Sequence, residues 1–278
     1  MRTILAVANE TIAGPKLIAR AREEAAKGDL RVVVCVPRKE PSHGNIVYEE
    51  TVYDAAQVRV DLARGVLREM GVDSIGEVGD PDPYSATMDA VAEYAPDQII
   101  VSTLPQSASG WLKRDFIERI EDAVRVPVEH IVTNLDEEDS PFDVTLVVAN
   151  RTTNSDALIA ELKSEAAGEA EGRERLFIFV VPMEGGSGLA HREARQRLDQ
   201  VIDRARAAGL VAAGMTGDPD PYTATMNALS FFDVDEVIIS TYPATRSGWL
   251  RADLVGRVRK AAGKPVKHIV SDDAQIPA

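Results

Sequence analysis

The chain contains the same long segment twice, and this duplication limits the folds that it can adopt. GDPDPYSATMDA at Gly79–Ala90 returns as GDPDPYTATMNA at Gly217–Ala228. With a shift of 138 residues, positions 79–132 align with 217–270 without a gap, and about half of the aligned residues are identical. The 278 residues therefore form two similar units, each of ordinary domain size.

The N-terminal parts of the two units also match, although more loosely. ILAVAN at Ile4–Asn9 corresponds to TLVVAN at Thr145–Asn150. The copies are joined by an acidic stretch with one proline, TNLDEEDSPF, which is typical of a short linker. We therefore predict a first domain at residues 1–135, a linker at 136–142 and a second domain at 143–278.

Short apolar runs alternate with helical apolar stripes within each unit. ILAVA, VVVCV and QIIVST have the continuous apolar character of strands that are covered on both faces. Between such runs, residues such as Ala55, Val58 and Leu62 recur at helical spacing. The alternation predicts an α/β fold with a doubly wound parallel sheet in each unit. In such sheets, ligands bind beyond the carboxyl ends of the strands, at the point where the strand order reverses.

The repeated GDPDPY motif indicates the start of a helix. Asp82 precedes Pro83, and a residue before proline is disfavoured in the helical region. We predict that Asp82 caps a helix that begins at Pro83, and that Asp220 and Pro221 do the same in the second unit. Because carboxylates at a helix N-terminus repel phosphate, the motif favours this structural role over a phosphate site.

Candidate ligand-binding residues follow the first and fourth strands of each unit. Their amide, hydroxyl and glycine groups can bind an anion near a helix N-terminus or can cap the helix, and both interpretations are open. The second unit has Arg246 and Arg251 in this region where the first has Ala108 and Lys113, which favours the second unit if only one binds. The candidates are Asn9, Thr11, Ser102, Thr103, Ser109 and Gly110 in the first unit, and Asn150, Thr152, Ser240, Thr241, Ser247 and Gly248 in the second.

Composition argues against several classes of partner. The formal net charge of −14 and the isoelectric point near 4.8 argue against nucleic acids and anionic membranes, which attract basic surfaces. No apolar run is long enough for a signal segment or a membrane span, so we expect a cytoplasmic protein. The one cysteine, Cys35, forms no internal disulfide, and the cysteine and histidine spacing indicates no metal site. We expect His130 and His268, in the last apolar runs, to be structural.

Taken together, these patterns resemble the universal stress protein family over essentially the whole chain. The resemblance rests on the five-strand alternation, the GDP turn after the third strand and the P-V-x-H-I-V ending of each unit. More narrowly, ISTYPATRSGWLRADL is similar to an actinobacterial-type branch. The resemblance implies Rossmann-like (HUP-type) domains with strand order 3-2-1-4-5. It also implies that the two domains pair through their last strands as an intrachain pseudo-dimer, and it is compatible with a homodimer.

Some members of this family bind ATP through a G-x-x-G loop after the fourth strand and a later Gly-Ser or Gly-Thr. Here the fourth strand is followed by STLPQSASG and STYPATRSG, and Asp115 and Asp253 fall near the Gly-Ser position. Asn9 and Asn150 stand where the family usually has an acid that holds the nucleoside. Members without the glycine signature are generally regarded as non-ATP-binding. No cofactor is therefore assigned, and ATP or another adenine nucleotide is the ligand left open.

We predict a non-catalytic stress-response or regulatory protein with two universal-stress domains. In this interpretation it either binds a small nucleotide weakly at the crevice between strands 1 and 4, or acts through partners. No residue is assigned as catalytic or as a metal ligand. The alternative is a nucleotide-handling enzyme of the same fold group, for adenylyl transfer or weak ATP hydrolysis, which would need a phosphate-orienting loop or a basic clamp. A flavin or electron-transfer module shares the fold class.

Overall fold

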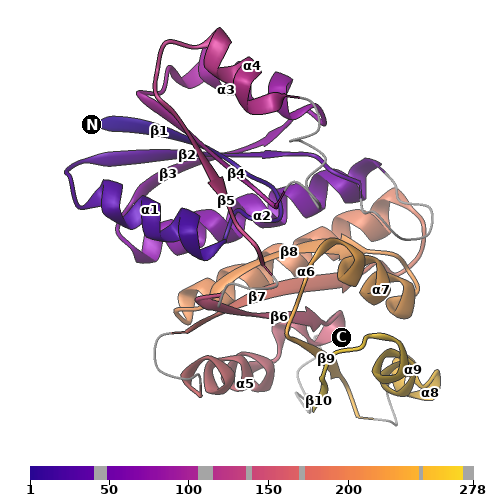
Figure 1. Cartoon of the computed structure of the whole chain (residues 1–278). Helices are drawn as coiled ribbons and strands as arrows, with labels where there is room; N and C mark the ends of the chain where they lie inside the picture. Colours follow the sequence, from indigo (N-terminus) through magenta and orange to yellow (C-terminus); the bar gives the residue numbers. More distant parts are fainter. Residues whose placement is uncertain (41–48, 106–114, 136–139, 169–172, 244–246, 272–278) are drawn as a thin grey trace. The chain divides into compact units, whose positions relative to one another are not determined.

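The structure is a computed structural model that describes residues 1–40, 49–105, 115–135, 140–168, 173–243 and 247–271. The chain divides into two compact units, one of residues 1–40 and 56–140 and one of residues 41–55 and 141–278. Each unit contains a five-stranded parallel sheet with helices on its faces (Figure 1). None of the helices among the described residues is both long and apolar enough to cross a membrane.

The first sheet has the strand order β3-β2-β1-β4-β5, which the resemblance implies. Helices α1 and α2 pack on one face and α3 and α4 on the other (Figure 1). The strands are β1 (Arg2–Val7), β2 (Leu30–Pro37), β3 (Asp73–Gly79), β4 (Gln98–Thr103) and β5 (Val128–Val132), and the helices are α1 (Pro15–Ala25), α2 (Glu49–Glu69), α3 (Pro83–Tyr94) and α4 (Phe116–Ala123).

The second sheet repeats this order as β8-β7-β6-β9-β10. Its first strand begins at Phe142, the last residue of the predicted linker. The strands are β6 (Phe142–Val148), β7 (Glu174–Pro182), β8 (Val211–Gly217), β9 (Glu236–Thr241) and β10 (Val266–Val270). The helices are the short 3-10 helix η2 (Arg151–Asn154), α5 (Asp156–Ala167), α6 (Gly188–Ala207), α7 (Pro221–Phe231), α8 (Gly248–Arg251) and α9 (Leu254–Ala261).

The GDPDPY motif starts a helix in both units, which confirms the prediction. The side chain of Asp82 accepts a hydrogen bond from the backbone N–H of Ser85 at 3.1 Å, and α3 begins at Pro83. Asp220 caps α7 in the same way. The motif tyrosine has a second role, because the guanidinium of Arg119 from α4 lies 4.0 Å from the ring centre of Tyr84. Cap and stacking together fix the direction in which the helix leaves the sheet.

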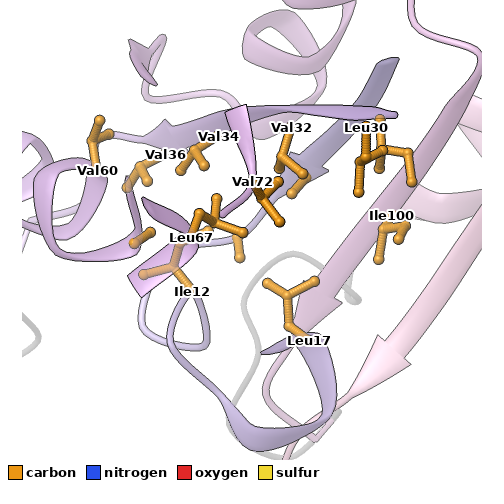
Figure 2. Packing of buried hydrophobic residues seen from close by; sticks show 14 of the residues in the cluster. Ile12, Leu17, Leu30, Val32, Val34, Val36, Val60, Leu67, Val72 and Ile100 are labelled. Carbon is orange, nitrogen blue, oxygen red and sulfur yellow. The ribbon is translucent and has the colours of Figure 1, made fainter. Parts of the chain in front are cut away.

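The cores of the two units are filled by side chains of different size. In the first unit, β2 points Val32 and Val34 towards Leu17 and Leu67 of the covering helices (Figure 2). An apolar cavity of about 30 Å³ lies among these residues. In the second unit, the equivalent positions on β7 carry Phe177 and Phe179 in the buried cluster under α5 and α6. The second unit therefore has larger side chains at these core positions than the first.

A buried carboxylate ties α1 to the sheet of the first unit. The side chain of Glu24 is 1% exposed and forms ion pairs with Arg2, Arg20 and Lys27. Burial alone would raise the pKa of this carboxyl group, but the three cations outweigh it and lower the pKa to about 2. Arg20 continues the network to Glu129 on β5, so the edge strand is joined to α1 by charge as well as by apolar packing.

Candidate functional site

The strand order reverses between β1 and β4 in the first unit and between β6 and β9 in the second. Val7, at the end of β1, pairs with Cys35 on one side and with Val101 on the other. Ligands of doubly wound sheets bind at this place because the connections on its two sides leave in opposite directions. The predicted residues at the ends of β4 and β9 and in the turns after β1 and β6 lie at this end of the sheets, and each is at most 9% exposed.

Two of the predicted threonines hold the turn after the first strand against the fourth strand. The hydroxyl of Thr11 donates to the carbonyl of Ser102 at 2.9 Å. In the second unit, the hydroxyl of Thr152 donates to the carbonyl of Ser240 at 3.2 Å. These hydroxyl groups therefore have internal partners beside the strand reversal.

The hydroxyls of the fourth strand face the last strand of each sheet. Thr103 Oγ1 lies 2.9 Å from Nε2 of His130, and Thr241 Oγ1 lies 2.8 Å from Nε2 of His268. Burial lowers the pKa of both imidazoles, so the neutral form is favoured. The histidines have a structural role, joining the edge strand to its neighbour.

The serines of the fourth strand form the same kind of link to the residue that follows the last strand. Ser102 Oγ lies 3.5 Å from Thr133 Oγ1, and Ser240 Oγ lies 3.3 Å from Ser271 Oγ. Both distances are longer than is usual for hydrogen bonds between hydroxyls, so these links are weak. Both serines are 1% exposed, so their hydroxyls are directed into the sheet and not towards solvent.

The asparagines differ from the hydroxyl residues because each leaves one polar atom unpaired. Asn9 donates through Nδ2 to the carbonyl of Pro37, and Asn150 donates through Nδ2 to Glu184 Oε1 at 3.2 Å. The Oδ1 atoms of both are buried and have no hydrogen-bond partner among the described residues. Leaving a buried acceptor unsatisfied costs about 1–3 kcal/mol. The same acceptor is therefore left without a described donor at the same place in both units.

An ion pair lies beside the strand reversal in each unit, and the positions of its positive and negative residues are exchanged between the units. Glu10 pairs with Lys39 at 2.8 Å in the first unit. In the second, Arg151 donates from Nε and Nη2 to the two carboxylate oxygens of Glu184 at 2.7 and 2.8 Å. The hydrogen bonds from Arg151 are the main cause that lowers the pKa of Glu184. The hydroxyl of Tyr242, after β9, donates to the carbonyl of Arg151 at 2.9 Å and so joins the segment after β9 to η2.

The sequence interpretation missed the arginines that approach the crevice from the long helices. Arg59 on α2 is 8% exposed, and burial lowers its pKa to about 10. The shift of 138 residues places Arg197 of α6 at the equivalent position. Arg197 is partly buried, and its positive charge contributes to the lowered pKa of Glu184. The signal was present in the sequence, since an arginine recurs at the same place within two otherwise apolar helical stripes.

The remaining predicted residues belong to the segment after the fourth strand. Ser247 is buried and accepts the backbone N–H of Leu250 at 3.3 Å, so it caps α8, and Gly248 is exposed at the first position of that helix. Ser109, Gly110 and Arg246 lie outside the described residues, as does the side chain of Arg251. In the part of the chain that the structure describes, no three histidine, cysteine or carboxylate side chains are placed to hold a metal ion.

Neither a scan against models of known protein families nor a search of curated proteins finds a match for this sequence. Among solved structures, the chain is similar to a universal stress protein from Archaeoglobus fulgidus, with 16% identity, a TM-score of 0.35 and coverage of 98% of this chain and 97% of that one. It is also similar to histidinol dehydrogenase from Elizabethkingia anophelis, with 12% identity, a TM-score of 0.25 and coverage of 98% and 53%. At these TM-scores neither likeness establishes a function, and the fold class follows from the two sheets themselves.

Proposed function

We propose that the chain is a non-catalytic regulatory protein of the universal stress type that binds an adenine nucleoside or nucleotide at the crevice of each unit. The observation that supports this proposal most directly is the pair of unpartnered Oδ1 atoms of Asn9 and Asn150 at the two points of strand reversal. The strand order and the sequence resemblance support the choice of protein class.

The chemistry of the asparagines limits the ligand. A carboxamide oxygen only accepts hydrogen bonds, so the ligand must present an N–H or O–H group. Adenine offers its exocyclic amine and ribose its hydroxyls. A site with a buried acceptor discriminates against ligands that lack the donor, because binding them leaves the acceptor unpaired. Selectivity for a nucleoside over an apolar molecule of similar size follows from this.

We also infer that the domains pair through their last strands and that the protein acts in the cytoplasm. Each last strand lies at an edge of its own sheet, with one strand neighbour among the described residues. These edges expose Val132 at 39% and Val270 at 48%. Exposed apolar edge strands tend to be covered by another strand.

Calorimetric titration of the full chain with adenosine, AMP and ATP tests the proposed ligand. We expect two sites, with binding weakened at the first in Asn9→Ala, at the second in Asn150→Ala, and at both in the double variant. Loss of one neutral hydrogen bond predicts an affinity about three- to tenfold weaker at each altered site. Asn154→Ala is the matched control, because Asn154 is exposed at the end of η2 and should leave binding unchanged.

Two outcomes contradict the proposal. Absence of binding by all three ligands, or binding that is insensitive to both crevice asparagines, removes the assigned site. Release of phosphate from ATP well above background would favour the alternative, a nucleotide-handling enzyme.

A further inference from the structure

A second set of unpartnered polar atoms belongs to the crevice of the second unit. Nε and Nη2 of Arg197 are buried and have no hydrogen-bond partner among the described residues. Arginine is rarely buried without a partner, because its guanidinium carries a permanent charge and five N–H donors. The two free donors therefore require an acceptor as strongly as Asn150 Oδ1 requires a donor.

Glu184 connects these two unpartnered groups. Its carboxylate accepts from Nδ2 of Asn150 at 3.2 Å, and the charge of Arg197 helps to lower its pKa. Arg197 forms no direct ion pair with Glu184, whose two oxygens are occupied by Arg151. The helix α6 that carries Arg197 packs against η2, the segment that follows Asn150. The free donors of Arg197 and the free acceptor of Asn150 thus border the same small region.

The geometry of the free donors selects the chemistry of the ligand. Nε and Nη2 lie on one side of the planar guanidinium and donate in parallel, which matches two oxygens of a carboxylate or phosphate. Arg151 and Arg197 each carry a positive charge, and Glu184 carries one negative charge. Together these three side chains have one positive charge in excess. Exclusion of bulk water strengthens a charge-assisted pair. Because the atoms are covered, a ligand enters by local opening of the surrounding side chains.

The equivalent arginine of the first unit is engaged differently. Arg59 is 8% exposed and is not without partners. The residue at the border of its crevice is Glu10, where the second unit has Arg151. A free pair of guanidinium donors is therefore described for the second unit and not for the first.

We propose that the second unit binds a small organic oxyanion, with Nε and Nη2 of Arg197 holding two oxygens of its phosphate or carboxylate and Asn150 Oδ1 accepting from an N–H or O–H of the same molecule. This inference rests on the proposed function in placing the ligand at the strand reversal. It adds that the two units differ. The second takes an anionic ligand such as a nucleoside monophosphate, and the first has no such preference.

The Nε–H NMR signal of Arg197, assigned by its loss in Arg197→Gln, tests the anion position without a nucleoside. Titration of the full chain with inorganic phosphate and separately with acetate should give a saturable shift of this signal. Arg192→Gln is the matched control, because Arg192 is exposed on the same helix and its replacement removes the same charge. A signal that does not move with either anion overturns the inference.

Measured affinities for adenosine, AMP and adenosine-5′-carboxylate show whether the second unit prefers phosphate or carboxylate. They also test anion binding by Arg197 separately from nucleoside binding. We expect AMP or the carboxylate to bind the second unit about tenfold more tightly than adenosine. Arg197→Gln should remove this preference and Arg197→Lys, which keeps the charge without the paired donors, should reduce it, whereas Arg192→Gln should keep it. A preference that survives both Arg197 variants overturns the inference. A shift of the Arg197 signal by phosphate with no nucleoside binding supports the inference and contradicts the proposed nucleoside ligand.

Discussion

The glycine of the repeated GDPDPY motif is expected to be required for helix packing and not for backbone flexibility. Gly217 ends β8 and does not lie in the left-handed region of backbone conformation. A Cβ atom at this position would lie 2.6 Å from the Cβ of Ala224 in α7 and 3.0 Å from a methyl group of Val180. The first unit has the same arrangement, because a Cβ on Gly79 would lie 2.5 Å from Ala86 Cβ.

The size of the effect follows from what must move in Gly217→Ala. The Cβ of Ala224 has no rotamer that avoids the clash, so α7 must shift by about 1 Å to restore an ordinary carbon–carbon contact. Overpacking of this kind costs about 1–3 kcal/mol, and the fixed neighbour places it in the upper part of that range. The substitution also restricts the unfolded chain, which offsets about 0.4–1 kcal/mol. We expect a net loss of about 1–2.5 kcal/mol in the free energy of unfolding of the second unit.

Urea denaturation followed by tryptophan fluorescence measures this loss unit by unit. Each repeat has one tryptophan, so a Trp111→Phe background leaves Trp249 as the reporter of the second unit. Gly186→Ala is the matched control, because a Cβ on Gly186 meets no atom within 4 Å, and its effect should stay within about 0.5 kcal/mol. Combining Gly217→Ala with Ala224→Gly should recover part of the loss. If Gly217→Ala is as stable as the parent, the packing explanation of the motif is wrong.

Three further predictions concern stability. Glu24→Gln should destabilise the first unit by about 2 kcal/mol at neutral pH. Because the pKa of Glu24 is lowered to about 2, the difference from the parent should shrink as pH falls from about 4.5 to about 2 in urea denaturation. The pKa values of His130 and His268 are lowered by burial, so parent stability should decline as pH falls below about 6.5, and NMR titration should place both beneath that value. Val34→Ile should fill part of the 30 Å³ cavity and raise the melting temperature, with a gain below the roughly 0.7 kcal/mol that about 24 cal/mol per Å³ gives for the whole volume.

The fold could be predicted because it depends on signals that are local in the sequence. Apolar runs and helical stripes gave the alternation of strands and helices, and the Asp-Pro pairs gave the first residues of α3 and α7. The duplication strengthened each inference, because two copies carry the same pattern. The strand order came from the family resemblance, and the structure agrees with it in both sheets.

The roles of the polar residues could not be predicted in the same way, because their partners are distant in sequence. The hydroxyl of Thr11 is used by the carbonyl of Ser102, 91 residues away, and Thr103 is engaged by His130 on the next strand. Residue type alone shows that a hydroxyl can bind a ligand, but only the register of the strands shows whether an internal partner has already taken it. Asn9 Oδ1 differs from these hydroxyls because it has no hydrogen-bond partner among the described residues.

Charge differences between the two copies are a poor guide to ligand preference unless both members of each pair are considered. Glu10 and Lys39 become Arg151 and Glu184, so the local charge of each pair is unchanged. The pair that joins the first helix to the edge strand is also reversed, from Arg20–Glu129 to Glu161–Lys267. Because each exchanged pair still has one positive and one negative residue, the exchange preserves the ion pair, and the two charges cancel at a distance. A difference in binding is therefore expected from donors left without a hydrogen-bond partner among the described residues. Nε and Nη2 of Arg197 are such donors, independently of Arg246 and Arg251, on which the sequence-based preference for the second unit depended.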